Sequence, residues 1–365
     1  MSSGGAARRI EGLDLLRGLA ILLVLVRHSW PEAVGTAGMV GVVTFFSLSG
    51  YLITGLLVSD ITRFGRVRYS RFYRNRAVRL LPALMFMLLG FVLVSLIWDP
   101  LGDRQQVLRS VIVALTYTMN IPFNHGSEAL SHLWTLATEE QFYLVWPIVL
   151  ALAIRFRKVA LGLIVSAAAI IVVLIATMVI TEPTIWRIYP LPTSWCIAMV
   201  IGAAGYFVMP RLTEWSRSLG SVHHYFSGGL LLVLLCLSAL PEAKGSPLTY
   251  LLVGPIAASA TVLLIPQLNE WQTVPTKWLA PLRALGQISY AAYLWNYPIH
   301  TWLNADPELP ARGILTIIFT VTAAMASWFL VERPAARLKA RWDSAASPTH
   351  PRIDATGSQP TPDPR

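Results

Sequence analysis

Charged residues are scarce in this sequence: they account for 13% of its 365 residues, whereas 55% are hydrophobic. A soluble domain of this length carries about a quarter charged residues, so the composition argues against a soluble globular fold. It predicts an all-α, polytopic membrane bundle with short loops, because a helix satisfies its own backbone hydrogen bonds in lipid. The net charge of +10 is then a topology signal, and we expect no nucleic-acid partner.

Cysteine is equally scarce, with only two residues in the chain. Cys196 and Cys236 both lie in apolar runs, so we expect no disulfide framework and no metal site. The sequence also lacks repeats at the spacing of a solenoid. We also expect no cleavable signal peptide, because the first apolar run is too long and has no small-residue cleavage site.

Apolar runs are what the chain has in abundance. About 20 such residues cross a bilayer as a helix, and we predict ten spans. The stretch from Arg63 to Arg79 holds seven arginines and no acid, which marks it as a cytoplasmic loop and places both chain ends in the cytoplasm. The predicted spans are residues 12–30, 39–58, 80–98, 136–154, 159–180, 193–209, 225–240, 251–266, 286–303 and 313–331.

The segment Val107–Phe123 is apolar but carries polar residues, and Pro122 ends it. If this segment crossed the membrane, the basic loops that follow would lie on the outer side, against the rule that basic loops stay in the cytoplasm. We therefore expect a re-entrant or interfacial helix on the outer side. The predicted organisation is a cytoplasmic N-terminus at 1–11, a membrane domain at 12–334 and a cytoplasmic tail at 335–365. The tail is rich in Pro, Ser and Thr from Ser344 onward, which predicts disorder there.

The first predicted span carries Asp14, Arg17, Arg27 and His28, although charges inside a membrane helix are costly. Arg17 and His28 are eleven residues apart, which returns to within about 20° of the same face roughly 16 Å further along the helix. Asp14, three residues before Arg17, is placed to neutralise it. The alternative is that both arginines only extend to the membrane interfaces.

The predicted topology brings His28, Glu139, Tyr293 and Asn296 into the outer half of the bundle. Imidazole suits proton transfer because it titrates near neutral pH, and a carboxylate on its second nitrogen fixes its tautomer. We therefore expect His28 to act as a general base and Glu139 to orient it. The alternative for Glu139 and its neighbour Glu140 is a solvated helix start.

Two arginines lie at the mouth of the third predicted span. Arg76 and Arg79 are three residues apart, where guanidinium groups are well placed to bind phosphate. The alternative for the arginine-rich stretch is topology and contact with anionic lipid, which fits Arg63, Arg66 and Arg68. The sequence thus predicts a polyanion site at the cytoplasmic face, apart from the proton-transfer groups further out.

Short motifs in a fixed order resemble the acyltransferase-3 family of bacterial integral-membrane acyltransferases, over about residues 10–334. Arg17 and His28 resemble the family's Arg–ten residues–His signature, and VTFFSLSGYLIT resembles a stretch that places Ser49 and Gly50. RFYRNRAVRLLP resembles its arginine-rich motif, with Asn75 replacing one arginine. The other similar segments are Tyr117–Asn120, HLWTLATEEQFYLVWP, GQISYAAYLWNYP and ASWFLVERP.

The resemblance implies transfer of an acyl group, acetyl or another short acyl, from acyl-CoA to a hydroxyl of a carbohydrate or related acceptor at the inner membrane. Acyl-CoA would be a substrate, and no permanently bound cofactor is expected. Asn296 stands where the family usually has His, which removes a second imidazole. The assigned residues are His28 and Glu139 for catalysis, Arg17, Arg76 and Arg79 for acyl-CoA, and Ser49, Asn120, Tyr290, Tyr293 and Asn296 for the pocket and oxyanion.

Other functions stay open at this point. Intramembrane Arg and His residues also occur in proton-coupled transporters, although we find no repeated half and no paired broken helices. A catalytically idle scaffold or sensor is a further alternative. Only a short tail follows the membrane domain, so we expect an enzyme that completes the transfer alone or hands over to a separate protein. A surface polysaccharide, a lipid-linked sugar, a glycolipid or a secreted small molecule such as a macrolide fits as acceptor.

Overall fold

The computed structural model describes residues 10–121, 126–242 and 244–345, and all regular structure in these ranges is helical. Seven helical stretches are long and apolar enough to span a membrane, so the chain is an all-α, multi-pass membrane protein. They comprise α2 (Ala37–Phe64), α3 (Tyr69–Ile97), η2 (Glu128–Leu133) with α5 (Trp134–Arg155), α6 (Val159–Thr181), α7 (Pro192–Ser218), η4 (Thr249–Val253) with α9 (Gly254–Glu270), and α12 (Arg312–Ser327) continuing through η6 (Trp328–Glu332) into α13 (Arg333–Ala345).

The three other predicted spans are also helical but shorter or more charged. Helix α1 (Glu11–Ser29) carries acids in its first turn and Arg27 in its last. Helices α8 (Val222–Ser238) and α11 (Ser289–Asn304) have only 17 and 16 residues. The predicted span 286–303 begins at a break, because α10 (Ala280–Gln287) ends where α11 starts.

Two further predictions concern the segment 107–123 and the C-terminal tail. Helix α4 (Val107–Leu115) has nine residues, so it rises about 14 Å, roughly half of a bilayer core of about 30 Å. It is therefore too short to cross, as expected, while Pro122 and Phe123 lie outside the described residues. The tail begins as helix α13 (Arg333–Ala345), and residues 346–365, which make up most of the segment predicted to be disordered, lie outside the described residues, so that expectation stays a prediction.

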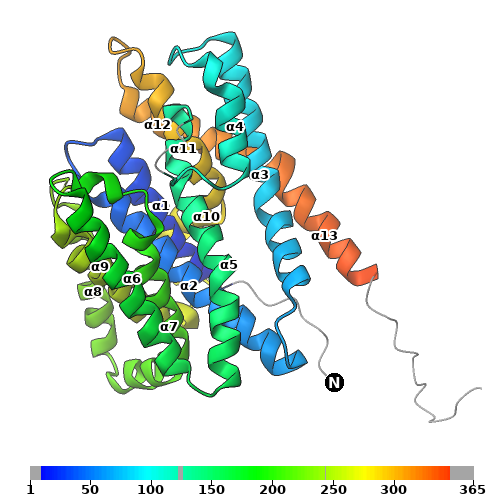
Figure 1. The fold of residues 1–365 in the computed structure, drawn as a ribbon, viewed down its shortest axis with the longest axis vertical. Coiled ribbons are helices and arrows are strands. Elements are labelled where there is room, and N and C mark those ends of the chain that lie inside the picture. The colour runs from blue at the N-terminus through cyan, green and yellow to red at the C-terminus, as the bar shows by residue number, and fades with distance from the viewer. Residues whose placement is uncertain (1–9, 122–125, 243, 346–365) are drawn as a thin grey trace, which may run out of the picture.

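Glycines allow the central helices to touch. Helices α2 and α7 pack along each other in the body of the bundle (Figure 1). A Cβ atom on Gly50 would lie 2.0 Å from the Met199 carbonyl oxygen, and one on Gly202 would lie 1.9 Å from the Ser47 carbonyl oxygen. Only glycine fits at these positions, as is common where membrane helices approach closely. Gly50 of the SLSG motif therefore sets helix packing.

A second glycine contact joins α1 to α10. A Cβ atom on Gly286 would lie 1.7 Å from the Asp14 carbonyl oxygen, and one on Gly18 would lie 1.9 Å from the Leu282 carbonyl oxygen. This close approach presses the α10–α11 corner against α1. It thereby fixes the register at which side chains of α11 meet the C-terminal end of α1.

The buried apolar side chains form two groups. The larger group joins α1, α2, α5, α6, α7 and α9. The smaller group fills the space between α3, α4, η2 and α11, around Met87, Phe91, Leu130 and Leu294. Helices α6 and α8 lie on the opposite side of the bundle from α3 and α13 (Figure 1). The polar residues described next lie in two places, one between α1, η2 and α11 and the other between α2, α3 and α5.

Candidate functional site

His28 is held at the C-terminal end of α1 by a residue of α11. Its Nδ1 atom lies 2.5 Å from Oδ1 of Asn296, whose side chain is fully buried. The Asn296 amide nitrogen donates to Oγ1 of Thr320 on α12 at 3.4 Å. Because an amide oxygen only accepts, His28 Nδ1 carries the proton in this arrangement. The other ring nitrogen, Nε2, then has its lone pair available to accept a proton.

Aromatic rings surround the His28 imidazole. It stacks on His300 with ring centroids 5.3 Å apart and meets the edge of Tyr297 at 5.1 Å. Tyr297 also contacts His132 of η2, with the centroids of these two rings 5.4 Å apart. We refer to His28, His132, Asn296, Tyr297 and His300 as the imidazole cluster. Three imidazoles from three elements thus gather at one end of the bundle.

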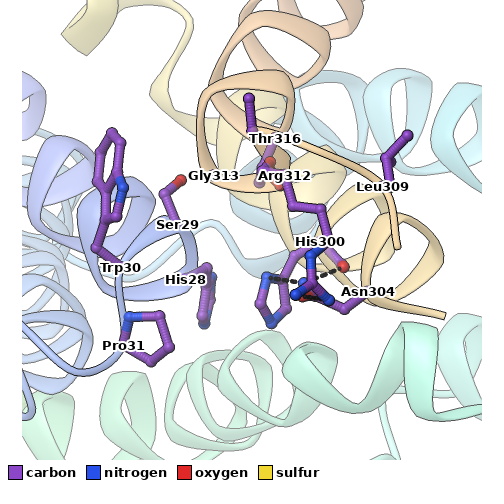
Figure 2. Close-up of a pocket in the computed structure, with 11 residues that line it drawn as sticks. His28, Ser29, Trp30, Pro31, His300, Asn304, Leu309, Arg312, Gly313 and Thr316 are labelled. Atoms are coloured by element: carbon purple, nitrogen blue, oxygen red, sulfur yellow. Dashed lines mark hydrogen bonds between the residues drawn. The ribbon is translucent and has the colours of Figure 1, made fainter. Parts of the chain in front are cut away.

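A cavity of about 370 Å³ opens beside this cluster. Its walls come from the end of α1, the end of α11 and the start of α12 (Figure 2). His28 and His300 both line it, so a molecule in the cavity has access to the predicted base. The other lining side chains that bear on the argument are Trp30, Asn304, Arg312 and Thr316.

Hydrogen bonds along the cavity wall fix the tautomer of His300. Arg312 donates through one terminal nitrogen to Oδ1 of Asn304 at 3.2 Å. The Asn304 oxygen therefore faces Arg312, and its amide nitrogen donates to Nδ1 of His300 at 2.9 Å (Figure 2). Since Nδ1 accepts, the neutral His300 ring carries its proton on Nε2.

Glu139 lies in a different set of contacts. Its carboxylate accepts a hydrogen bond from Ser49 Oγ at 2.9 Å and pairs with Arg76 at 3.4 Å. Arg76 also pairs with Glu140 at 2.6 Å, and its guanidinium lies 3.6 Å from the centre of the Tyr143 ring. We refer to these five residues as the ion-pair cluster. The expected contact between Glu139 and His28 is therefore wrong for this structure, because a half-buried carboxylate pairs with a guanidinium in preference to a neutral ring.

The residues predicted to bind acyl-CoA are not equally available. Arg17 pairs with the fully buried Asp14 at 3.4 Å, as the three-residue spacing indicated. Arg76 is 15% exposed and already faces two carboxylates. Arg79, by contrast, is exposed on α3. The phosphate-binding role of these arginines stays a prediction, with Arg79 the most accessible of the three.

The remaining predicted pocket residues lie away from the cavity. Asn120 and Gln141 exchange two hydrogen bonds, of 2.8 and 3.0 Å, which fasten the segment after α4 to α5. The Tyr293 hydroxyl accepts from Thr135 at 2.7 Å and donates to the His132 carbonyl oxygen at 3.0 Å. The Tyr290 and Ser49 hydroxyls also have protein partners, the Leu80 carbonyl oxygen at 3.3 Å and the Glu139 carboxylate at 2.9 Å. An oxyanion role for these groups stays a prediction.

The sequence of this chain is similar to those of known proteins. The acyltransferase domain model of the acyltransferase-3 family matches residues 10–332. The chain belongs to the acyltransferase-3 family. Over 350 residues it is 29% identical to "O-acetyltransferase OatA" of Staphylococcus aureus, and over 362 residues it is 29% identical to "Putative peptidoglycan O-acetyltransferase YrhL" of Bacillus subtilis.

A third relative of this acyltransferase-3 chain is "Peptidoglycan O-acetyltransferase OatA" of Listeria monocytogenes, which is 27% identical over 355 residues. These three matches cover 90%, 90% and 89% of the present chain. They cover 57%, 55% and 55% of the relatives, so the chain spans little more than half of their length. No solved structure gives a significant match.

The acyltransferase-3 chain also uses residues that sequence reasoning missed. His300 follows Asn296 by four residues and Tyr297 follows Tyr293 by four, so helical spacing places each pair on one face. His132 stands in the quoted motif HLWTLATEEQFYLVWP but received no role. Among the residues that the structure describes, no three His, Cys, Asp or Glu side chains are grouped as a metal ion requires.

Two elements connect the imidazole cluster with the ion-pair cluster. On α5, Thr135 contacts Tyr293 beside the imidazole cluster, and Glu139 follows one turn later, a rise of about 6 Å. On α11, Tyr290, Tyr293 and Tyr297 recur at three- and four-residue spacing and so share one face. Polar side chains therefore continue along α5 and α11 from one cluster to the other.

Proposed function

We propose that this chain is a membrane O-acyltransferase that moves an acetyl or other short acyl group from acyl-CoA to a hydroxyl of a carbohydrate or related acceptor. The observation that carries the proposal is His28 in the wall of the cavity with Nδ1 held by Asn296, which leaves Nε2 as a proton acceptor. Membership of the acyltransferase-3 family and relatives named O-acetyltransferases support the same activity.

In this mechanism His28 Nε2 removes the proton from the acceptor hydroxyl as its oxygen attacks the thioester carbonyl. Collapse of the tetrahedral intermediate breaks the carbon–sulfur bond, and the CoA sulfur leaves with the proton returned by the imidazolium. Asn296 keeps the His28 ring in one tautomer throughout, as the third group does in hydrolase triads. A general base of this kind contributes about 10²–10⁴-fold to the rate.

The donor side of the proposal uses the opposite end of the bundle. Acyl-CoA enters from the cytoplasm, with its phosphates near Arg17 and Arg79, and Arg76 contributes by positioning Glu139. The pantetheine arm carries the acyl group, still bound as its thioester, along the polar side chains of α5 and α11 to His28. All ten predicted spans cross the inner membrane with both ends in the cytoplasm, which agrees with the basic residues of α13. Helix α4 lies in the outer interface.

The acceptor in this proposal is a glycan on the outer side. Two relatives carry peptidoglycan in their names, which supports a cell-wall saccharide as the first acceptor to examine. The direct test is mass spectrometry of surface glycans and exported metabolites from cells with and without the gene. We expect one acyl mass to disappear without it.

Complementation with variants ties that result to the site. The parental gene and a variant with His224→Ala, an exposed histidine on α8, should both restore the acyl mass, whereas His28→Ala should not. Restoration by His28→Ala at equal protein level would contradict the role of His28. Transport by proteoliposomes without acyl-CoA, together with no lost acyl mass, would replace the proposal by a transporter.

A further inference from the structure

The cavity beside His28 contains a cation but no carboxylate. Arg312 is the one arginine among its eleven lining residues, and none of the eleven is Asp or Glu. The nearby acids do not neutralise it: Asp306 and Glu308, in the loop before α12, form no ion pair with Arg312 in the described chain. Arg27, which precedes His28, is already paired with Glu242 at 2.6 Å. The cavity thus keeps an unbalanced positive charge.

Arg312 is oriented to receive a ligand. Only one of its terminal nitrogens is used within the described residues, in the bond to Asn304. The remaining guanidinium donors suit the paired oxygens of a carboxylate or a phosphate. The same bond directs the Asn304 amide toward His300, which leaves His300 with a proton on Nε2. Arg312 and His300 are therefore both hydrogen-bond donors.

A second wall of the cavity fits a sugar ring. Trp30 is 44% exposed, and its indole packs against Gly313, where an added Cβ would lie 3.2 Å from the ring. This contact holds a flat, partly apolar surface in place, of the kind on which the C–H face of a pyranose packs. Ser29 also lines the cavity, but its hydroxyl oxygen is buried and makes no hydrogen bond with the described residues.

We propose that this cavity is the acceptor site and that Arg312 selects a saccharide carrying an anionic group, carboxylate or phosphate, close to the hydroxyl that receives the acyl group. The inference rests on the proposed function, because it takes the ligand beside His28 to be the acyl acceptor. Trp30 supports the sugar ring, and Arg312 binds the anion. The hydroxyl to be acylated then faces His28.

The test measures binding without acyl transfer. The full chain in lipid nanodiscs is examined by saturation-transfer NMR with three probes: glucuronic acid, glucose 6-phosphate and neutral glucose. We expect both anionic probes, or whichever of the two matches the natural anion, to bind about tenfold more tightly than glucose, as a charge-assisted hydrogen bond provides. Arg312→Gln should remove this preference, and Arg312→Lys should keep part of it.

An exposed arginine in η3 (Ile185–Ile188) provides the matched control. Arg187→Gln removes the same charge outside the cavity and should leave the preference unchanged. Equal binding of glucose and the anionic probes, no binding of any probe, or a preference that survives Arg312→Gln would overturn the inference. Anion-selective binding by a chain that transfers no acyl group would instead contradict the proposed function while the binding site stands.

Discussion

The imidazole cluster and the ion-pair cluster both include residues of one continuous helical stretch, Glu128–Arg155, yet they are built differently. In the ion-pair cluster, opposite charges meet at 2.6 and 3.4 Å, and Ser49 satisfies a remaining carboxylate oxygen. In the imidazole cluster the groups are rings and amides, their closest ring centroids are 5.1 to 5.4 Å apart, and His28 borders a cavity.

The difference indicates two roles. A charge that is locked by opposite charges in a half-buried site stabilises the bundle and is costly to remove singly. A neutral base beside a cavity has few bonds to lose and is free to exchange a proton with a ligand. We therefore assign structural support to the ion-pair cluster and chemistry to the imidazole cluster. The predictions below separate stability from activity to test that division.

The largest effect on stability should come from Arg76→Met. This change leaves Glu139 and Glu140 without their shared cation, and their side chains are only 21% and 19% exposed. We expect the free energy of unfolding to fall by about 3 kcal/mol, the lower end for breaking a buried pair. Thermal unfolding of the purified protein in detergent measures it. His28→Ala should change the same quantity by less than about 1 kcal/mol.

Two further variants test the reason for that loss. Arg104→Met removes an arginine that is 51% exposed and 3.8 Å from its partner carboxylate, so it should cost no more than about 0.5 kcal/mol. Adding Glu139→Gln and Glu140→Gln to Arg76→Met should recover part of the stability, because no buried charge is then unpaired. Equal losses for the Arg76 and Arg104 variants would show that the ion-pair cluster stabilises the bundle no more than an exposed ion pair does.

A smaller effect, now on activity, is expected from Asn296→Ala. The change frees His28 Nδ1 from its 2.5 Å contact, so acyl transfer should slow about tenfold, the equivalent of one hydrogen bond. Asn296→Asp should restore the rate, because a carboxylate also accepts from Nδ1. Asn269→Ala, which removes an amide bonded to Tyr51 on α2, is the matched control. A parental rate in Asn296→Ala would show that Asn296 does not position His28.

The smallest effect concerns an exposed ion pair at the rim of the imidazole cluster. Burial raises the pKa of Glu242, but its bonds to Lys244 and Arg27 outweigh this and lower the pKa below its ordinary value of 4.5. The stabilisation is therefore present above pH 4.5 and is lost as pH falls through the lowered pKa. Because Glu242 is 42% exposed, we expect only a few tenths of a kcal/mol.

Unfolding temperatures measured on both sides of pH 4.5 detect this contribution, and Glu242→Gln should abolish its share of the difference. High salt should weaken the exposed Glu242 pair more than the ion-pair cluster, because buried pairs are less screened. An equal response to salt at the two places would argue that both pairs are solvated alike.

Much of the helical framework was predictable because lipid imposes one simple rule. Each predicted span falls on a helix, since an apolar run in a membrane has no other way to satisfy its backbone. The Asp14–Arg17 pair was also predictable, because residues three apart on a helix are neighbours whatever the tertiary structure. The break between α10 and α11 was not, because it depends on Gly286 meeting the backbone of α1.

The candidate site shows the same limit. Topology predicted that His28 and Asn296 lie at one depth, and the structure brings them into contact. The partner of Glu139 could not be predicted from the sequence, because it depends on how α3 and α5 are rotated about their own axes. One such rotation turns Arg76 toward α5 and gives Glu139 a guanidinium instead of an imidazole. The cavity could not be predicted either, because it forms where the ends of α1 and α11 and the start of α12 come together, and residue spacing within one helix does not determine that.

The most direct test of the account compares acyl transfer by the purified parental chain, His28→Ala and His224→Ala in nanodiscs. Release of free CoA from acetyl-CoA is followed with soluble peptidoglycan fragments as acceptor, alongside thermal unfolding of each protein. We predict that His28→Ala lowers the rate by about 10²–10⁴-fold with unfolding unchanged, while His224→Ala matches the parental chain. A folded His28→Ala protein that transfers acyl groups at the parental rate would contradict the central claim.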